Sequence, residues 1–466
     1  MLYDLQSKSF AVSGVNVIGL LLGKPLKVSA LRVQEPLLLI THMLEEATKK
    51  SEPLYSTLQG MGRQLQIKHI TIEKGRLRVR QGREAKADKF SVENLSLQAD
   101  DLRLDSASYH HQERAYYTRR LALETGKVDV RLPDGTYRLR SSSLKANTED
   151  GTLHMGRFEV VPLLKNAQLA RRKGEAATTV RLLVPEIRFS GVNYPVHSRH
   201  NNLVASHVVL QNPSLSAYLD RKNFSQKTTK PLPHDLVQDL KTGFTLAKLE
   251  VKGMHIRYEE LSPQANETGV ITFENLYATA TNLTNDGNRM SRRRPAVVEA
   301  KASINGKVPL AFTLRLHLLD PNAHHTIRGT VGPADPAILN PILEPTTLIS
   351  VKEGRLQKSD FTIELNRHRA RGNLNVRYQN FKVDILTKDE DTRQSLGKKI
   401  LSKAANKFVI KSDNPEDGEE LRAGEIAVVR AKNRSVFNYW KDCLVSGFRT
   451  AAGIEGMGED LNDPER

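Results

Sequence analysis

The sequence predicts a mainly β protein in which an elongated, repetitive antiparallel sheet curls into an apolar groove, with short amphipathic helices near the C-terminus. Three observations predict this fold. One irregular spacing of apolar residues recurs along the chain, polar and basic residues alternate with the apolar ones, and a chain-bending residue stands inside each copy. At 466 residues the chain exceeds the size at which one compact core stops growing, so a repetitive structure or several domains are expected.

The recurring unit consists of five apolar residues separated in turn by two, one, four and one other residues. Five complete copies and one partial copy occur in the chain. The complete copies are Val28, Leu31, Val33, Leu38 and Ile40; Ile67, Ile70, Ile72, Leu77 and Val79; Val92, Leu95, Leu97, Leu102 and Leu104; Val184, Ile187, Phe189, Tyr194 and Val196; and Leu246, Leu249, Val251, Ile256 and Tyr258. The partial copy is Ile349, Val351 and Leu356.

The gap of four residues in each copy contains a residue of a type that bends or reverses a chain. These residues are Pro36, Gly75, Asp100, Gly191, Gly253 and Gly354. Each copy is therefore expected to form one strand, a tight turn or bulge, and a second strand.

Apolar residues alternate with polar or basic ones on either side of the gap, as they do from Arg76 to Arg80. A period of two places apolar side chains on one face of a strand and charged side chains on the other. Any half-buried antiparallel sheet alternates in this way, but the recurrence of one irregular spacing favours a repeated architecture.

The predicted sheet is large enough to form a groove. Strands of about 8 to 10 residues over half of the chain amount to roughly 20 strands, and open sheets of that size curl or split. At about 4.8 Å per strand, a groove on the apolar side would run on the order of 100 Å. Helical segments are too few to cover it, so it needs another apolar occupant or must close on itself. The residues expected to line the groove are Val28, Leu31, Val33, Leu38, Ile40, Ile67, Ile70, Ile72, Leu77, Val79, Val92, Leu95, Leu97, Val184, Ile187, Phe189, Leu246, Leu249, Val251 and Ile256.

Two amphipathic helices are predicted near the C-terminus. The first, Thr392 to Asn406, has Leu396, Ile400 and Ala404 on one side and lysines on the other. The second, Ser435 to Ala452, has an apolar stripe formed by Phe437, Trp440, Leu444 and Phe448. This stripe is expected to face a membrane or a partner protein, or else to plug the end of the groove.

The charge of the chain indicates anionic partners. It has 70 Lys and Arg against 53 Asp and Glu, a net charge of +17 and a pI near 9.7. Nucleic acid, acidic lipid headgroups and lipopolysaccharide all carry the required charge. Nucleic acid is the less favoured partner and is not expected, because aromatic residues are only 6% of the chain, the basic residues are dispersed, and no zinc-finger or RNA-binding signature occurs.

The sequence gives little support for an enzymatic or a metal-dependent function. It contains no nucleophile-elbow, phosphate-loop or zinc-protease motif. Its two adjacent histidine pairs would point to opposite faces of a strand, so no metal, no cofactor and no catalytic residue is expected. Cys443 is the only cysteine, which excludes an intramolecular disulfide, and no run of about 20 apolar residues is present to span a membrane.

Three stretches near the C-terminus carry a family resemblance. They are Asn340 to Pro345 followed by Ile349 to Leu356 and Phe361; Gly372 to Tyr378 with Phe381 to Leu386; and Arg434 to Lys441. Over residues 328–454 the chain resembles the closing module of AsmA-like proteins, a TamB-related family of bridge-like lipid-transfer proteins of the Gram-negative envelope. The upstream repeats are similar in pattern only.

The resemblance implies a non-enzymatic, membrane-associated protein of the periplasm and cell envelope, with a part in outer membrane biogenesis. It would bind or guide lipid, phospholipid above all, along the β-groove between the inner and outer membranes. Its partners would be phospholipid or another anionic envelope lipid, the membrane surface and other envelope proteins. The family's N-terminal inner-membrane anchor does not precede Leu2, so the chain is expected to be a truncated relative or to have a misassigned start.

The expected domain organisation has three parts: repeated β-groove modules over residues 1–304, a closing β module over 305–390, and C-terminal helices with a tail over 391–466. Two other functions stay open. One is a structural envelope scaffold that transfers no lipid, in which the protein's own side chains fill the groove. The other, less favoured, is a basic nucleic-acid-binding protein.

Overall fold

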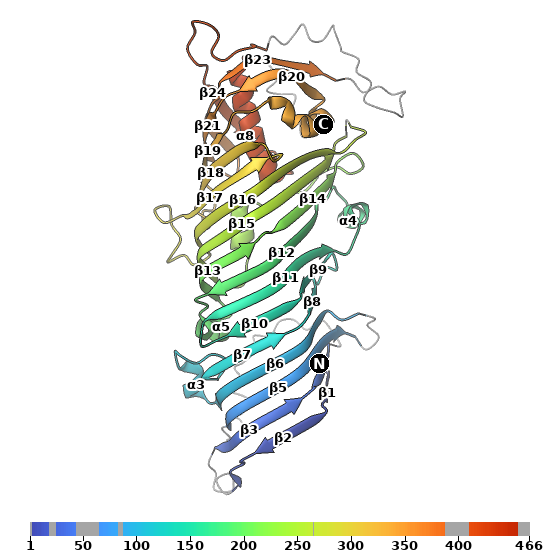
Figure 1. Ribbon diagram of the computed structural model, residues 1–466, viewed down its shortest axis with the longest axis vertical. Coiled ribbons are helices and arrows are strands. Elements are labelled where there is room, and N and C mark those ends of the chain that lie inside the picture. Colours follow the sequence, from blue (N-terminus) through green and yellow to red (C-terminus); the bar gives the residue numbers. More distant parts are fainter. Residues whose placement is uncertain are drawn as a thin grey trace. The chain divides into compact units, whose positions relative to one another are not determined.

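The structure is a computed structural model that describes residues 2–17, 25–42, 65–82, 87–263, 265–386 and 410–454. It is mainly β, as predicted, with a 22-stranded, mostly antiparallel sheet, a two-stranded sheet, several short helices and one longer C-terminal helix (Figure 1). The chain forms two compact units. Unit 1 comprises residues 1–163, 182–211 and 242–247, and unit 2 comprises residues 164–181, 212–241 and 248–466.

Unit 1 is built almost entirely of strands. The elements that lie wholly or mainly in it are β1 (Leu2–Gln6), β2 (Ser9–Ser13), β3 (Leu26–Gln34), β4 (Leu37–His42), β5 (Leu65–Gln81), β6 (Phe90–Leu104), α3 (Ser106–His110), β7 (Arg120–Thr125), β8 (Val128–Arg131), β9 (Tyr137–Ser141), β10 (Ser143–Asn147), β11 (Thr152–Pro162), β12 (Thr179–Ser190), α5 (Tyr194–His200) and β13 (Leu203–Gln211).

Unit 2 combines strands with helices. Its elements are α4 (Asn166–Lys173), β14 (Ser214–Asp220), α6 (Pro233–Gln238), β15 (Phe244–Leu261), β16 (Gly269–Thr284), β17 (Ala296–Ile304), β18 (Val308–Leu316), β19 (His325–Val331), a 3-10 helix (Pro336–Leu339), α7 (Asn340–Thr347), β20 (Ile349–Leu356), β21 (Ser359–Leu365), β22 (Arg369–Asn375), β23 (Tyr378–Ile385), β24 (Gly424–Val429) and α8 (Val436–Ala451).

The strands of unit 1 are mostly antiparallel, with two exceptions. β3 and β4 both run parallel to β5, one beside each half of that 17-residue strand. β6 then pairs antiparallel with β5 along nearly its whole length and continues to β7 and β8. In unit 2, β14 is parallel to β15, and β16 to β19 are followed by β21, β22 and β24 in antiparallel order. β20 pairs with β23 in the separate two-stranded sheet.

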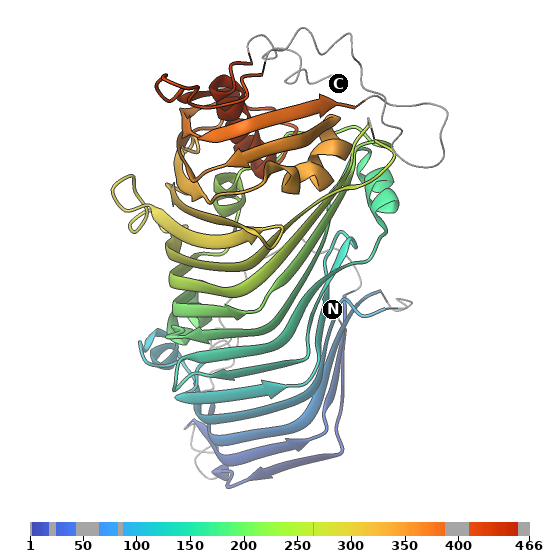
Figure 2. The same ribbon diagram turned by 45° about the horizontal axis from the view of Figure 1, so that its top comes forward.

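The long strands bend along their length (Figure 2), and left-handed backbone conformations lie at the predicted gaps. Gly191, Gly253 and Gly354 have positive φ angles of 63°, 68° and 148°. Next to the other three predicted residues, the left-handed residues are Glu35, Lys74 and Asp101. β5, β6 and β15 run through the gap as single strands, so in these copies it is a bend within a strand and does not reverse the chain.

One predicted copy is wrong in its second half. Tyr194 and Val196 were expected on a strand, but they lie in α5. Pro195 stands in the first turn of this helix, and the side chain of Asn193 accepts a hydrogen bond from the backbone N–H of Val196 at 2.9 Å. A capping asparagine and an early proline are strong helix starts, and here they override the apolar spacing.

The C-terminal helix forms where it was predicted. α8 spans Val436–Ala451, and Ser435 is its N-cap residue. The other predicted helix, Thr392 to Asn406, lies outside the described residues. The module boundaries expected at residues 304 and 390 stay predictions.

Candidate functional site

One face of the unit 1 sheet is apolar from strand to strand. Residues directly opposite each other on neighbouring strands project from the same face, so the strand register traces this face across the unit. One row is Phe10, Val33, Ile72, Leu97, Leu123, Ala146, Leu153, Phe189 and Val208. A second row is Tyr3, Ile40, Val79, Phe90, Val130, Leu139, Val160 and Leu182. We call these two rows the unit 1 apolar face.

The bends explain the gap of four residues in the repeat. Ile72 and Leu77 are five positions apart, so a regular strand would send them to opposite faces. In β5 the left-handed residue Lys74 and register shifts around Gly75 interrupt the alternation between them. Ile72 then lies opposite Leu97 and Leu77 opposite Val92. The bulge therefore lets both halves of the strand present apolar side chains to the same side.

The glycine at this bulge is closely packed. A Cβ atom at Gly75 would lie 3.3 Å from the carbonyl oxygen of Leu95 and 3.3 Å from Cγ of Pro36. A side chain at this position would need Pro36 or Leu95 to shift by a few tenths of an ångström.

The unit 1 apolar face is only partly covered by the described residues. Six of the predicted lining residues of this unit are buried, and the others are half-buried. The buried ones are Val28, Val33, Ile67, Val92, Val184 and Ile187. Toward the edge of the sheet exposure rises, to 67% for Tyr3 and 64% for Phe10. The described helices of the unit, α3 and α5, are five and seven residues long, too short to cover a sheet of this width.

The opposite face of the unit 1 sheet is charged. Asp129 lies 3.1 Å from Arg138 and 3.4 Å from Arg140 on the neighbouring strand. Arg80 pairs with Asp88 at 2.6 Å. The two faces therefore have different chemistry, as the alternation predicted.

The remaining predicted lining residues lie on β15, most of which belongs to unit 2. Leu249, Val251 and Ile256 are half-buried, and Ile256 lies opposite Leu215 of β14. Leu246, also on β15, is half-buried. Val251 borders a shallow hollow of about 890 Å³ whose lining includes Tyr277, Lys301 and Arg328. This hollow has mixed charge and is not the continuation of an apolar face.

The apolar face of the C-terminal part of unit 2 is covered by α8. Its register row is Val298, Leu314, Ile327, Ile363, Gly372 and Ile426. Ile363 and Ile426 are each 1% exposed, and they share a core with Tyr439 and Cys443 of α8. A sheet face of the same chemistry is thus partly exposed in unit 1 and largely buried here.

α8 lies close to the sheet because small residues face it. A Cβ atom at Gly447 would lie 2.8 Å from Cβ of Leu374 and 2.9 Å from Cγ1 of Ile426. A Cβ atom at Gly424 of β24 would meet the carbonyl oxygen of Gly447 at 2.0 Å. Helix and strand backbones are therefore in direct contact at this point.

The buried side of α8 differs from the predicted stripe. The fully buried residues are Val436, Tyr439, Cys443, Gly447 and Ala451. Of the predicted stripe, Trp440, Leu444 and Phe448 are half-buried at the side of the core, and Phe437 is 71% exposed. The recurrence of small residues at every fourth position from Cys443 to Ala451 is the signal that could have identified the true contact side.

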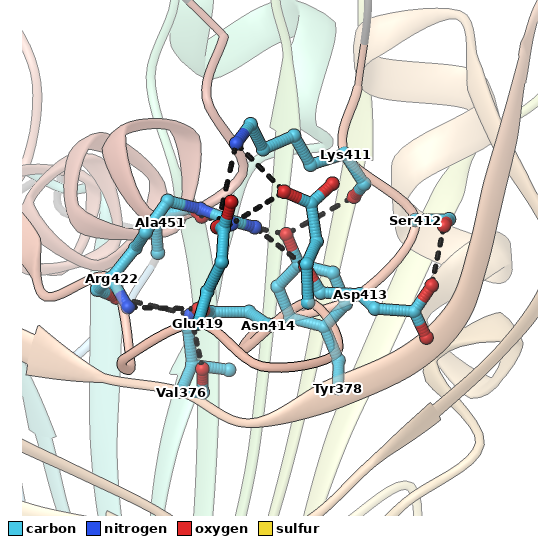
Figure 3. A network of polar contacts seen from close by, with 10 residues as sticks. Val376, Tyr378, Lys411, Ser412, Asp413, Asn414, Glu419, Arg422 and Ala451 are labelled. Atoms are coloured by element: carbon cyan, nitrogen blue, oxygen red, sulfur yellow. Dashed lines mark hydrogen bonds and ion pairs between the residues drawn. The ribbon is translucent and has the colours of Figure 1, made fainter.

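A polar network holds the C-terminal end of α8 (Figure 3). The guanidinium of Arg422 donates to the carbonyl oxygens of Asp413 and Ala451, at 2.5 Å and 3.2 Å. The buried Asn414 side chain donates to the carbonyl of Val376 and accepts from the N–H of Arg422. Helix C-termini have unsatisfied carbonyls, and Arg422 satisfies one of them. The sequence gives no signal for this network, because its members are far apart along the chain.

α8 also closes the outer edge of β24. Thr450 Oγ1 donates to the carbonyl of Glu425 at 3.0 Å, and Ser446 Oγ accepts from the N–H of Ala427 at 3.4 Å. These are backbone groups that an edge strand otherwise offers to another chain.

Two buried histidines lie beside the first half of α8. Trp440 Nε1 donates to Nε2 of His325 at 3.2 Å, and His325 Nδ1 lies 2.8 Å from the carbonyl of Ala323. His325 is therefore a neutral ring whose proton is on Nδ1. The His234 ring is 0% exposed and its centroid is 5.4 Å from that of His325. Burial lowers the pKa of His234 to about 4 and also lowers the pKa of His325.

No helix within the described ranges is both long enough and apolar enough to cross a membrane. Across the same residues, no three His, Cys, Asp or Glu side chains gather in a way that could hold a metal ion. No family model and no curated protein matches the chain. Its most distinctive site is the unit 1 apolar face.

Proposed function

We propose that the chain is a non-enzymatic envelope protein that binds lipid, phospholipid in particular, on the unit 1 apolar face and guides it between the inner and outer membranes. The observation that carries the proposal is the row of apolar side chains that crosses nine strands of unit 1. Among the described residues, Val33 and Val208 of this row are buried, and the other seven side chains are half-buried or exposed. The resemblance to AsmA-like proteins points to the same function.

The chemistry of this face suits an acyl chain. Soluble proteins rarely expose apolar patches larger than a few hundred Å², and larger ones usually bind another apolar surface. Apolar contact is non-directional and contributes about 0.8 kcal/mol for each buried CH₂ group. Rows that run from strand to strand give a long flexible chain equivalent contacts at every step, as expected of a path along which lipid moves.

The charge of the chain supports an anionic lipid. The net charge is +17, and Arg292, Arg293 and Arg294 are all exposed in the loop between β16 and β17. A basic surface attracts acidic headgroups at a membrane and raises the local concentration of the lipid.

Glutamate substitutions on the two faces of β5 test the proposal. In Ile72→Glu and Leu97→Glu, a carboxylate enters the apolar row at two directly opposed positions, where it blocks an acyl chain. The matched control is Thr71→Glu, one position away on the other face and opposite Arg32. We expect native mass spectrometry in mild detergent to find copurified phospholipid with the wild type and the control, and at least tenfold less with Ile72→Glu and Leu97→Glu. Thermal unfolding of each variant shows whether the fold is retained.

Equal amounts of lipid in all folded variants would contradict the lipid site. Absence of lipid from the wild type as well would favour the structural scaffold, in which protein side chains fill the apolar face. One observation favours the scaffold: in unit 2 the protein's own helix α8 covers the apolar face of the sheet.

A further inference from the structure

The first bent strand of unit 1 has an open edge. β1 pairs with β4, and β2 pairs with β3, with Tyr3 opposite Ile40 and Phe10 opposite Val33. Among the described residues no strand pairs with the other edge of β1 and β2. All ten residues of these two strands are exposed.

This edge lacks the usual protection against pairing. Natural proteins protect open edges with lysines, prolines or a covering segment. From Leu2 to Ser13 the only charged residues are Asp4 and Lys8, and proline is absent. The edge of β24, in contrast, is closed by Ser446 and Thr450 of α8.

The apolar spacing of this strand reads the same in both directions. Tyr3, Leu5, Phe10 and Val12 are separated by one, four and one residues, as in the repeat. Two antiparallel strands of this kind therefore align their apolar residues on one side and their bends at the same level. The pairing of β1 and β2 with β4 and β3 already has this geometry, because one register holds on both sides of the bend.

We propose that a second copy of this chain pairs with the β1–β2 edge, antiparallel, about a two-fold axis between Ser7 and Lys8. Tyr3 then lies opposite Val12 of the second copy, and Leu5 lies opposite its Phe10. The apolar rows of the two copies join across the axis, because Tyr3, Leu5, Phe10 and Val12 pair only with one another. Such an interface is isologous and closes after two chains.

Proline at Ala11 tests the pairing without disturbing β3. Asn16 N–H donates to the carbonyl of Lys27, its direct opposite on the continuation of the β2–β3 register. Hydrogen-bonded pairs alternate along an antiparallel ladder, so the N–H of Ala11 points to the open edge. Ala11→Pro removes that donor. In sedimentation velocity over a concentration series, we expect the wild type to form dimers and Ala11→Pro to dissociate at least tenfold more readily.

Charge at the same position tests the register. In the proposed dimer Ala11 lies opposite Asp4 of the second copy, whereas its neighbour within the chain is Arg32. We expect Ala11→Lys to tighten the dimer and Ala11→Glu to weaken it, each by about 2- to 30-fold over the two symmetric contacts. Within the chain the effect on unfolding has the opposite sign, because glutamate pairs with Arg32 and lysine repels it. The two effects are therefore separable.

The proposal fails if the wild type is a monomer throughout the series, if Ala11→Pro dimerises as tightly as the wild type, or if Ala11→Glu dimerises more tightly than Ala11→Lys. It is independent of lipid binding, since Ile72→Glu and Leu97→Glu leave the β1–β2 edge unchanged.

Discussion

His234 is a buried ring that the fold keeps uncharged. Its pKa is lowered to about 4, first by burial and then by the neighbouring His325. Protonation of His234 places a positive charge in this buried core. The sequence shows fourteen histidines but gives no sign of which are buried, because His234 and His325 meet only through the fold.

Acid is expected to destabilise the protein through His234. Its folded pKa of about 4 lies below the unfolded value near 6.5, so between these values the unfolded chain binds more protons and stability falls as pH falls. The full loss is about 3 kcal/mol, already large by pH 5. We expect the denaturant midpoint of the wild type to drop from pH 7 to pH 5, and His234→Phe to reduce this drop. Parallel curves for the two proteins would exclude His234 as the source.

At lower pH, the protonation of carboxylates determines how the stability of the fold changes. Burial alone would raise the pKa of Glu175, but hydrogen bonds from Lys230, from Thr228 and from two backbone N–H groups lower it to about 2. Its contribution to stability is present above pH 4.5 and is lost below it, outside the window used for His234.

At the scale of elements, the repeat predicts where strands and their bends lie better than it predicts which side chains make contacts. Period-two alternation placed the strands β3, β5, β6, β12 and β15, and the recurring gap placed the bends within β5, β6 and β15. What local spacing could not supply was the competing helix start at Asn193 and Pro195, or which side of α8 contacts the sheet. The contact side depends on how closely two backbones approach, and hydrophobicity alone predicted the aromatic side.

A substitution at Gly447 tests the close contact between α8 and the sheet. In Gly447→Val, added side-chain atoms would collide with Leu374 and Ile426, and overpacking of this kind costs about 1–3 kcal/mol. We expect a lower guanidinium midpoint and increased binding of a hydrophobic dye as α8 leaves the sheet. Val445→Ala, at a largely exposed position of the same helix, is the control and should change neither. Unchanged stability of Gly447→Val would contradict the packing described for α8.

At the scale of the whole molecule, the excess of basic residues should govern binding to membranes. We expect the protein to bind vesicles that contain phosphatidylglycerol, to bind neutral vesicles weakly, and to dissociate as salt increases.

The loop of Arg292, Arg293 and Arg294 tests whether position or net charge matters. Replacing all three with glutamine should weaken vesicle binding by about a hundredfold, at about 1 kcal/mol per charge. The matched control replaces Arg171, Arg172 and Lys173 of α4 with glutamine. These three residues are also exposed, and their replacement removes the same amount of charge. Equal losses in both variants would show that net charge alone attracts the protein. A preference for single-stranded nucleic acid over vesicles would favour the nucleic-acid-binding alternative.

The hydroxyl groups of Ser446 and Thr450, on α8, bond to backbone groups of β24 and limit how many molecules can join through strand edges. In the language of polymer chemistry, a monomer with one reactive end gives dimers, and a monomer with two gives chains. Among the described strands of the 22-stranded sheet, α8 blocks the β24 end and leaves the β1–β2 end free to pair, so pairing through the ends of this sheet stops at two molecules. The 22-stranded sheet therefore cannot extend into a fibre through both of its ends, and detaching α8 would remove that restraint.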